Sequence, residues 1–125
     1  MNHVVIGIGS NLPDSKRIVK RCCEDIGSIV LSSLFSSCYQ TVAVGTIPQA
    51  DYHNCVGIID TDSDYAEMRS VFKAMEKKEG RTPDGKLHGV VALDIDIVIW
   101  NDTVISPRDL TQDYIQKGLK QLTDR

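Results

Sequence analysis

The stretch "ALDIDIVIW", residues 92–100, places two carboxylates inside the most hydrophobic run of the chain. Its β-branched residues are typical of a strand, in which successive side chains point to opposite faces. Asp94 and Asp96 therefore share one face with Ala92 and Val98. The opposite face is wholly apolar and suits packing against helices; its members are Leu93, Ile95, Ile97 and Ile99.

The segment before this strand predicts a helix that can cover its apolar face. Residues 61–80 carry an apolar stripe at helical spacing, formed by Tyr65, Met68, Val71, Phe72 and Met75. We expect Asp62 or Ser63 to cap the start of this helix, because their side-chain oxygens can accept a bond from an unpaired amide. Gly80 is expected to end it. The stripe is interpreted as part of the core.

The remaining segments predict an α+β fold. A second helix is expected to begin at Pro13 or Asp14 and to end at Gly27. Further elements are strands at 3–9, 28–41, 52–60 and 90–100, a C-terminal helix at 111–122, loops at 42–51 and 81–89, and a turn with a short extended piece at 101–110. The order β-α-β-β-α-β with a short C-terminal helix predicts a ferredoxin-like sandwich, with two helices on one face of a mainly antiparallel sheet.

Length and composition are those of one soluble domain over residues 1–125. The chain is 42% apolar and 25% charged, and its formal net charge of −3 argues against nucleic-acid binding. No apolar run approaches membrane-spanning length, and the start lacks the pattern of a signal peptide, so we expect a cytoplasmic protein that binds no membrane. Four cysteines lack metal-site spacing and are interpreted as reduced packing residues: Cys22, Cys23, Cys38 and Cys55.

The two aspartates allow two interpretations. Carboxylates this close repel each other, and partial burial raises the pKa of at least one. A bound divalent cation removes that conflict, and carboxylate oxygens suit Mg²⁺, which keeps several waters and bridges to phosphates. Alternatively, Asp94 and Asp96 lie on a face that is open to water and have no further role. The stretch alone does not decide between a metal site and a solvated face.

Five motifs together resemble the 6-hydroxymethyl-7,8-dihydropterin pyrophosphokinase family. They occur in the family's order over roughly the first 110 residues. The motifs are "IGIGSNLPD", "SSCYQTVAVG", "QADYHN", "EKKEGR" and "ALDIDIVIWND". The resemblance implies transfer of pyrophosphate from ATP to 6-hydroxymethyl-7,8-dihydropterin in folate biosynthesis, with AMP as the second product. It also implies two Mg²⁺ ions as cofactors and small molecules as the only ligands, in a monomer or weak homodimer.

The resemblance also assigns residues to the site. It implies that Asp94 and Asp96 hold both Mg²⁺ ions and that Arg81 acts with them in catalysis. It assigns pterin binding to Thr41, Val44, Gly45, Tyr52 and Asn54. It assigns nucleotide binding to Glu76, Arg81, Ile97, Thr111 and Tyr114.

The chain departs from the family pattern just before the aspartates. Val90 and Val91 stand where the family has a proline and an arginine that contacts the ATP phosphates, and an aliphatic side chain cannot replace a guanidinium. The family's later histidine and arginine are not evident. Two alternatives to an active enzyme therefore stay open: a catalytically impaired homologue that binds a pterin or a nucleotide, and a ferredoxin-like assembly domain without a small ligand.

Overall fold

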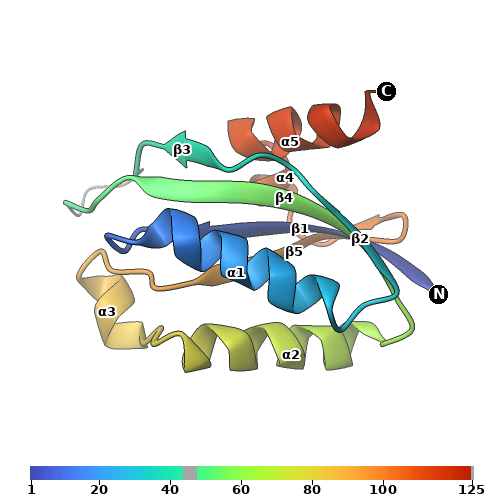
Figure 1. Ribbon diagram of the computed structural model, residues 1–125, viewed down its shortest axis with the longest axis horizontal. Helices are drawn as coiled ribbons and strands as arrows, with labels where there is room; N and C mark the ends of the chain where they lie inside the picture. The colour runs from blue at the N-terminus through green and yellow to red at the C-terminus, as the bar shows by residue number, and fades with distance from the viewer. Residues whose placement is uncertain (44–47, 125) are drawn as a thin grey trace.

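The computed structural model describes residues 1–43 and 48–124, and over these residues the chain forms a six-stranded antiparallel sheet (Figure 1). The strand order is β2-β4-β1-β5-β6, and β3 also pairs with β4. The strands are β1 (Asn2–Ser10), β2 (Ser32–Phe35), β3 (Tyr39–Thr41), β4 (Tyr52–Thr61), β5 (Asp94–Trp100) and β6 (Thr103–Val104). The predicted ferredoxin-like α+β class is confirmed.

Helices cover both faces of this sheet. The helices are α1 (Ser15–Gly27), α2 (Tyr65–Lys78), α3 (Pro83–Leu87), α4 (Pro107–Leu110) and α5 (Asp113–Thr123). As predicted, α1 and α2 lie together on one face, whereas α5 lies on the other (Figure 1). The face that carries the aspartates is therefore covered in part by α5, and the picture of one fully solvated face is wrong. Within the described residues, no helix is both long and apolar enough to cross a membrane.

The two faces have separate apolar cores. The larger core lies under α1 and α2 and contains Leu93, Ile95 and Ile97, as the alternation of β5 predicts. The smaller core joins Val56, Val98 and Ile115, and Ile99 packs against it. The prediction for Ile99 is wrong because the register between β1 and β5 shifts between Val5 and Ile6. An irregularity of this kind moves the following side chains to the other face.

Helix α5 packs unusually close to the sheet. A methyl group on Gly118 would lie 2.3 Å from Cγ2 of Val56, so only a glycine fits between the helix backbone and β4. The side chain of Ile115 is fully buried beside this contact. The backbone of α5 therefore approaches the sheet more closely than a helix with a larger residue at this position would.

Local differences from the sequence predictions have local causes. Helix α2 is capped by Asp64, and not by Asp62 or Ser63, because Asp64 and Glu67 form a reciprocal capping box. The predicted loop at 81–89 contains α3, which Thr82 caps and Pro83 begins. The single strand expected over 28–41 is divided into β2 and β3, the strand expected over 90–100 begins only at Asp94, and 101–110 contains α4 as well as β6.

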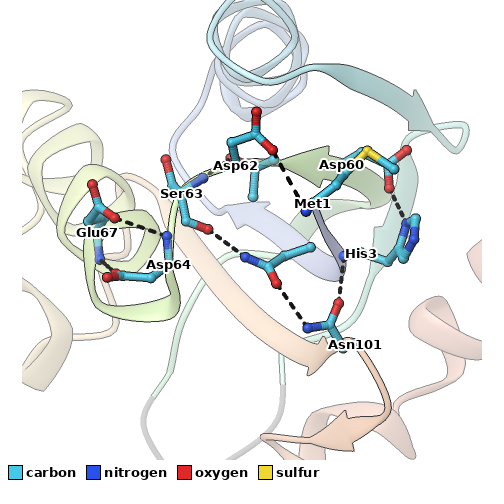
Figure 2. Close-up of polar contacts among 10 residues, drawn as sticks. Met1, His3, Asp60, Asp62, Ser63, Asp64, Glu67 and Asn101 are labelled. Atoms are coloured by element: carbon cyan, nitrogen blue, oxygen red, sulfur yellow. Dashed lines mark hydrogen bonds and ion pairs between the residues drawn. The ribbon is translucent and has the colours of Figure 1, made fainter.

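Polar side chains hold the start of β1 in place (Figure 2). The amide of Asn2 donates to the carbonyl oxygen of Ser63 at 2.8 Å, and Asn101 donates to Asn2 at 3.0 Å. Asn101 also accepts a bond from the backbone N–H of His3 at 2.8 Å. The ring of His3 contacts Asp60, and its side chain is exposed. This end of β1 is thereby joined to β4, to the start of α2 and to the turn after β5.

Candidate active site

The far end of β1 provides two glycines that form the floor of the candidate site. Gly9 pairs with Asn54 on β4 and with Asp94 on β5, and Gly7 pairs with Asp96. A methyl group on Gly9 would lie 2.3 Å from Oδ1 of Asn54, so the amide leans over that glycine. Directly paired residues share a face of an antiparallel sheet. The amide and both carboxylates therefore gather over a floor that has no side chains of its own.

Tyr114 of α5 bounds this floor on one side. A methyl group on Gly7 would lie 2.8 Å from the Tyr114 hydroxyl, so the ring occupies the space above that glycine. Burial raises the pKa of Tyr114, and the negative charge of Asp96 raises it further. The phenol consequently stays protonated and is a hydrogen-bond donor beside the carboxylates.

Arg81 links the first carboxylate to a buried partner. Its Nη1 donates to Oδ1 of Asp94 at 2.6 Å and to Oε2 of Glu76 at 3.0 Å. Glu76 is only 4% exposed, and the same Oε2 accepts the backbone N–H of Ile95 at 2.8 Å. Gly80, with φ of 103°, turns the chain after α2 so that the N–H of Arg81 returns to the carbonyl oxygen of Glu76. The resulting network fixes Asp94 at the start of β5.

Among the described residues, no salt bridge joins a cation to Asp96, whereas Asp94 is paired with Arg81. Burial raises the pKa of Asp96 to about 8, and the charge of Asp94 adds to the rise. Opposite charge lowers a carboxylate pKa, whereas burial and like charge raise it. The pair is therefore electrostatically unbalanced, with Asp94 matched by a guanidinium and Asp96 holding a proton near neutral pH. A cation placed between the two carboxylates would displace that proton.

Three of the residues assigned to pterin binding lie beside the carboxylates. The amide of Asn54 donates to the hydroxyl of Thr41, which joins β4 to β3. The hydroxyl of Tyr52 donates to Oε1 of Gln49 at 3.1 Å. Tyr52 lies two residues before Asn54 on β4, so the two side chains share a face of the strand. Burial raises the pKa of Tyr52, and the charge of Asp94 raises it further. The other two, Val44 and Gly45, lie outside the described residues.

A cavity of about 210 Å³ opens at the edge of β5, between α2 and α4. Asp96 and Ile97 line it from the strand, and Arg69 and Lys73 line it from α2. Nζ of Lys73 lies 3.5 Å from Oε1 of Glu76. Thr111 follows α4 with an exposed side chain, and its hydroxyl donates to the carbonyl oxygen of Arg108 at 2.8 Å. The structure thus brings Ile97 to a cavity beside Asp96, whereas Thr111 is engaged with its own turn.

Comparison with known proteins gives a match over most of the chain. Positions 5–124 of the chain match the family described as 7,8-dihydro-6-hydroxymethylpterin-pyrophosphokinase (HPPK). The chain belongs to the HPPK family. It is also similar to the 2-amino-4-hydroxy-6-hydroxymethyldihydropteridine pyrophosphokinase of Helicobacter pylori (strain ATCC 700392 / 26695). The two are 28% identical over 116 residues, which cover 87% of this chain and 69% of that relative.

In this HPPK-family chain, the segment before β5 packs in the core and is bonded to Asn11. The side chain of Val91 is only 6% exposed, so a position assigned to a phosphate-binding arginine holds a core residue. The backbone of Val91 exchanges two bonds with Asn11, at 2.8 Å and 3.0 Å. The amide of Asn11 also donates to the carbonyl oxygen of Gly89 at 2.7 Å. Asn11 therefore fixes the approach to the carboxylate pair, a role that the sequence analysis missed.

Sequence reasoning also missed the cations of the edge cavity. Arg69 and Lys73 are four residues apart on α2, on the side that the apolar stripe leaves free. Residues at this spacing are neighbours on a helix surface. Their periodicity was available in the sequence, but only the folded chain places them beside Asp96.

The candidate metal ligands among the described residues are the carboxylates of Asp94 and Asp96. Within the described residues, no group of three or more His, Cys, Asp and Glu side chains is placed to hold a metal ion. Two neighbouring carboxylates without a complete cage suit Mg²⁺, which commonly takes one or two protein carboxylates and fills its other positions with water and substrate phosphates. Asp94 and Asp96 fit this chemistry. The raised pKa of Asp96 indicates that its negative charge is poorly balanced, and a bound cation would balance it.

Proposed function

We propose that this chain transfers a pyrophosphoryl group from ATP to 6-hydroxymethyl-7,8-dihydropterin, a reaction of folate biosynthesis. The observation that supports the proposal most directly is the row across the sheet formed by Asn54, Gly9 and Asp94. It joins an amide suited to recognition of a heterocycle to a carboxylate pair suited to phosphate-bound Mg²⁺. The side chains approach each other because the central residue of the row is a glycine.

In the proposed pterin pocket, Asn54 reads the donor and acceptor edge of the heterocycle. An amide offers both an acceptor oxygen and two donors, which matches a ring edge that alternates between the two. The bond to Thr41 fixes the orientation of that amide. Tyr52 supplies an aromatic wall at the same end of β4, and Val44 and Gly45 are proposed to complete the pocket.

In the proposed phosphate site, Asp94 and Asp96 would hold two Mg²⁺ ions. When bound, these ions neutralise the triphosphate and polarise its oxygens, which is the main catalytic contribution in phosphoryl transfer. Arg81 keeps Asp94 oriented through the bond of 2.6 Å and presents positive charge to the phosphates. The Tyr114 hydroxyl, which lies above Gly7 on the side of Asp96, would donate a hydrogen bond to the bound phosphates.

The edge cavity is proposed to receive the rest of the nucleotide. Ile97 lines it with apolar surface, Glu76 contacts Lys73 of its lining, and Thr111 directly follows α4. Lys73 and Arg69 contribute the positive charge that Val91 does not. Because both are on the surface of α2, we expect them to act on ATP binding more than on the chemical step.

The test is to incubate the protein with ATP, Mg²⁺ and 6-hydroxymethyl-7,8-dihydropterin and to measure pterin-dependent AMP. Asp96→Asn should abolish AMP release while the variant remains folded, and Asp102→Asn, an exposed carboxylate in the turn before β6, is the matched control. AMP release that ignores the pterin, or that survives in Asp96→Asn, would contradict the proposal.

A second candidate function is pterin binding without turnover. The buried position of Val91 favours it, because an aliphatic side chain in the core supplies no positive charge to bind the phosphates. Calorimetry with the pterin alone and with a non-hydrolysable ATP analogue separates the two candidates. Pterin binding without analogue binding at millimolar Mg²⁺ supports the binding module, and binding of both supports the enzyme.

A further inference from the structure

Two thiols from different elements meet on the face of the sheet that α1 and α2 cover. Sγ of Cys23 on α1 lies 3.3 Å from Sγ of Cys55 on β4, and 32 residues separate the two along the chain. All four cysteines of the chain are free thiols. A sulfur–sulfur contact needs only a modest approach to reach the bonded length of about 2.05 Å. This pair therefore differs from thiols that merely fill space in a core.

The two thiols differ in exposure and in acidity. Cys55 is only 1% exposed, whereas Cys23 is half-buried and can be reached from solvent. The hydrogen bond from Cys55 lowers the pKa of Cys23, and the same contact raises the pKa of Cys55. The thiolate is the reactive form of cysteine. The accessible member of the pair is thus the more reactive one, and the buried member lies directly behind it.

The other two cysteines are placed differently. Cys22, the neighbour of Cys23 in sequence, is 3% exposed in the core between α1 and α2, and burial raises its pKa. Cys38 is half-buried, and burial raises its pKa as well. Neither has a thiol contact among the hydrogen bonds of the described residues. They serve as internal controls for the reactivity of the pair.

The geometry points to Cys23 and Cys55 as a site of oxidative modification, at which a peroxide converts the two thiols into an intramolecular disulfide. The sulfur of Cys23 attacks one oxygen of hydrogen peroxide, the O–O bond breaks, and a sulfenic acid and one water form. The sulfur of Cys55 then attacks that of Cys23, the S–O bond breaks, and the second water leaves with the proton of Cys55. Two thiols and one peroxide give one disulfide and two waters.

The bond would tie α1 to the middle of the sheet. Cys55 directly follows Asn54 and pairs with Ile8, between the two glycines of β1. The bridge therefore joins the helix layer to the strands that carry the candidate site. The proposal does not depend on which reaction that site performs, because its readout is the state of the thiols.

The test uses the full chain, reduced and then treated with one equivalent of hydrogen peroxide. Thiols are counted after unfolding in an alkylating reagent, and two of the four should be lost. Trypsin cannot locate the bridge, because no Lys or Arg lies between Arg21 and Arg69. A protease specific for acidic residues cleaves at Glu24 and Asp51 and separates Cys38 and Cys55 from the peptide that holds Cys22 and Cys23. Mass spectrometry can then identify the linked peptides, and fragmentation of the linked pair distinguishes Cys22 from Cys23.

Single variants give the result that decides. Cys22→Ala and Cys38→Ala should still lose two thiols, whereas Cys23→Ser and Cys55→Ser should form no intramolecular bridge. Circular dichroism of each reduced variant identifies any that fail to fold. If a variant does not fold, the linked peptides of the unsubstituted chain show which cysteines form the bridge. Four thiols remaining after treatment, or a bridge that contains Cys38, would overturn the proposal.

Discussion

The two ends of β1 show opposite ways of handling a carboxylate. At the Asn2 end, Asp60 accepts hydrogen bonds from Ser32 and His3, and these lower its pKa. Figure 2 shows the contact with His3. At the Gly7 end, burial and the charge of Asp94 raise the pKa of Asp96 to about 8. At the first end, the protein's own side chains provide hydrogen bonds to the carboxylate. At the other end, within the described part of the chain, the carboxylate of Asp96 lacks a positive charge to balance it. A strand can therefore be stabilised at one end while its other end remains suited to a ligand.

The largest expected effect is on catalysis at the unbalanced end. Asp96→Asn removes a proposed metal ligand, and even residues that only support such ligands contribute about 10- to 100-fold. We expect AMP release to fall by at least about 100-fold, measured at saturating Mg²⁺. Asp60→Asn at the satisfied end should leave AMP release unchanged. Equal losses in the two variants would remove the distinction between the ends.

The next effect concerns the glycine floor. Gly9→Ala places a methyl group 2.3 Å from Oδ1 of Asn54, so the amide must move and its bond to Thr41 is lost. We expect a stability loss of about 1–3 kcal/mol, typical of overpacking, and weaker pterin binding by calorimetry. Gly27→Ala is the matched control, because its added methyl lies 3.3 Å from Oγ of Ser33. A Gly9→Ala protein that binds pterin normally would show that the floor need not be bare.

The raised pKa of Asp96 predicts a pH dependence of stability. Between its ordinary pKa of 3.8 and about 8, the folded protein holds a proton that the unfolded chain releases. Stability from this group is therefore present below about pH 4 and is lost as the pH rises toward 8. Thermal unfolding from pH 5 to pH 8 should show this decline, and Asp96→Asn should reduce it. Mg²⁺ binding at pH 7 should release a proton, measurable by calorimetry in two buffers of different ionisation enthalpy.

The smallest effect is expected at the satisfied end. Asn101→Gly keeps the backbone free to adopt φ of 54° but removes the bonds to Asn2 and to the N–H of His3. Because these bonds are exposed, we expect a loss of no more than about 1 kcal/mol, measured by denaturant unfolding. AMP release should not change. A large loss of activity would show that the two ends are coupled through β1.

The sequence predicted what depends on local pattern. The alternation of residues 92–97 and the stripe on α2 fixed the larger core, since each reflects the periodicity of one element. The prediction failed at Ile99, where the register with β1 shifts, because that register depends on a partner about 90 residues away in the chain. The helix at 83–87 was missed because a five-residue helix has too few turns to show a period.

The same limit applies to the candidate site. Asp94, Asp96 and Arg81 were identified from motifs, and the structure brings the three together. The contribution of Gly7 and Gly9 was not predicted, since the residues above them come from β4 and α5. The cavity formed with Arg69 and Lys73 required the packing of α2 against the edge of β5. Long-range packing, and not residue identity, was the missing information.

The contact between Gly118 and Val56 gives α5 the character of a spacer. Because residue 118 has no side chain, the backbone of α5 lies close to the sheet. Tyr114 is one turn earlier on the same helix, so its distance from Gly7 depends on that close contact. The space between Tyr114 and Gly7 could therefore be changed by a substitution at position 118, outside the site. Residues at position 118 of graded size would raise the tyrosine stepwise, which offers a way to alter the size of ligand accepted without changing any residue that contacts the ligand.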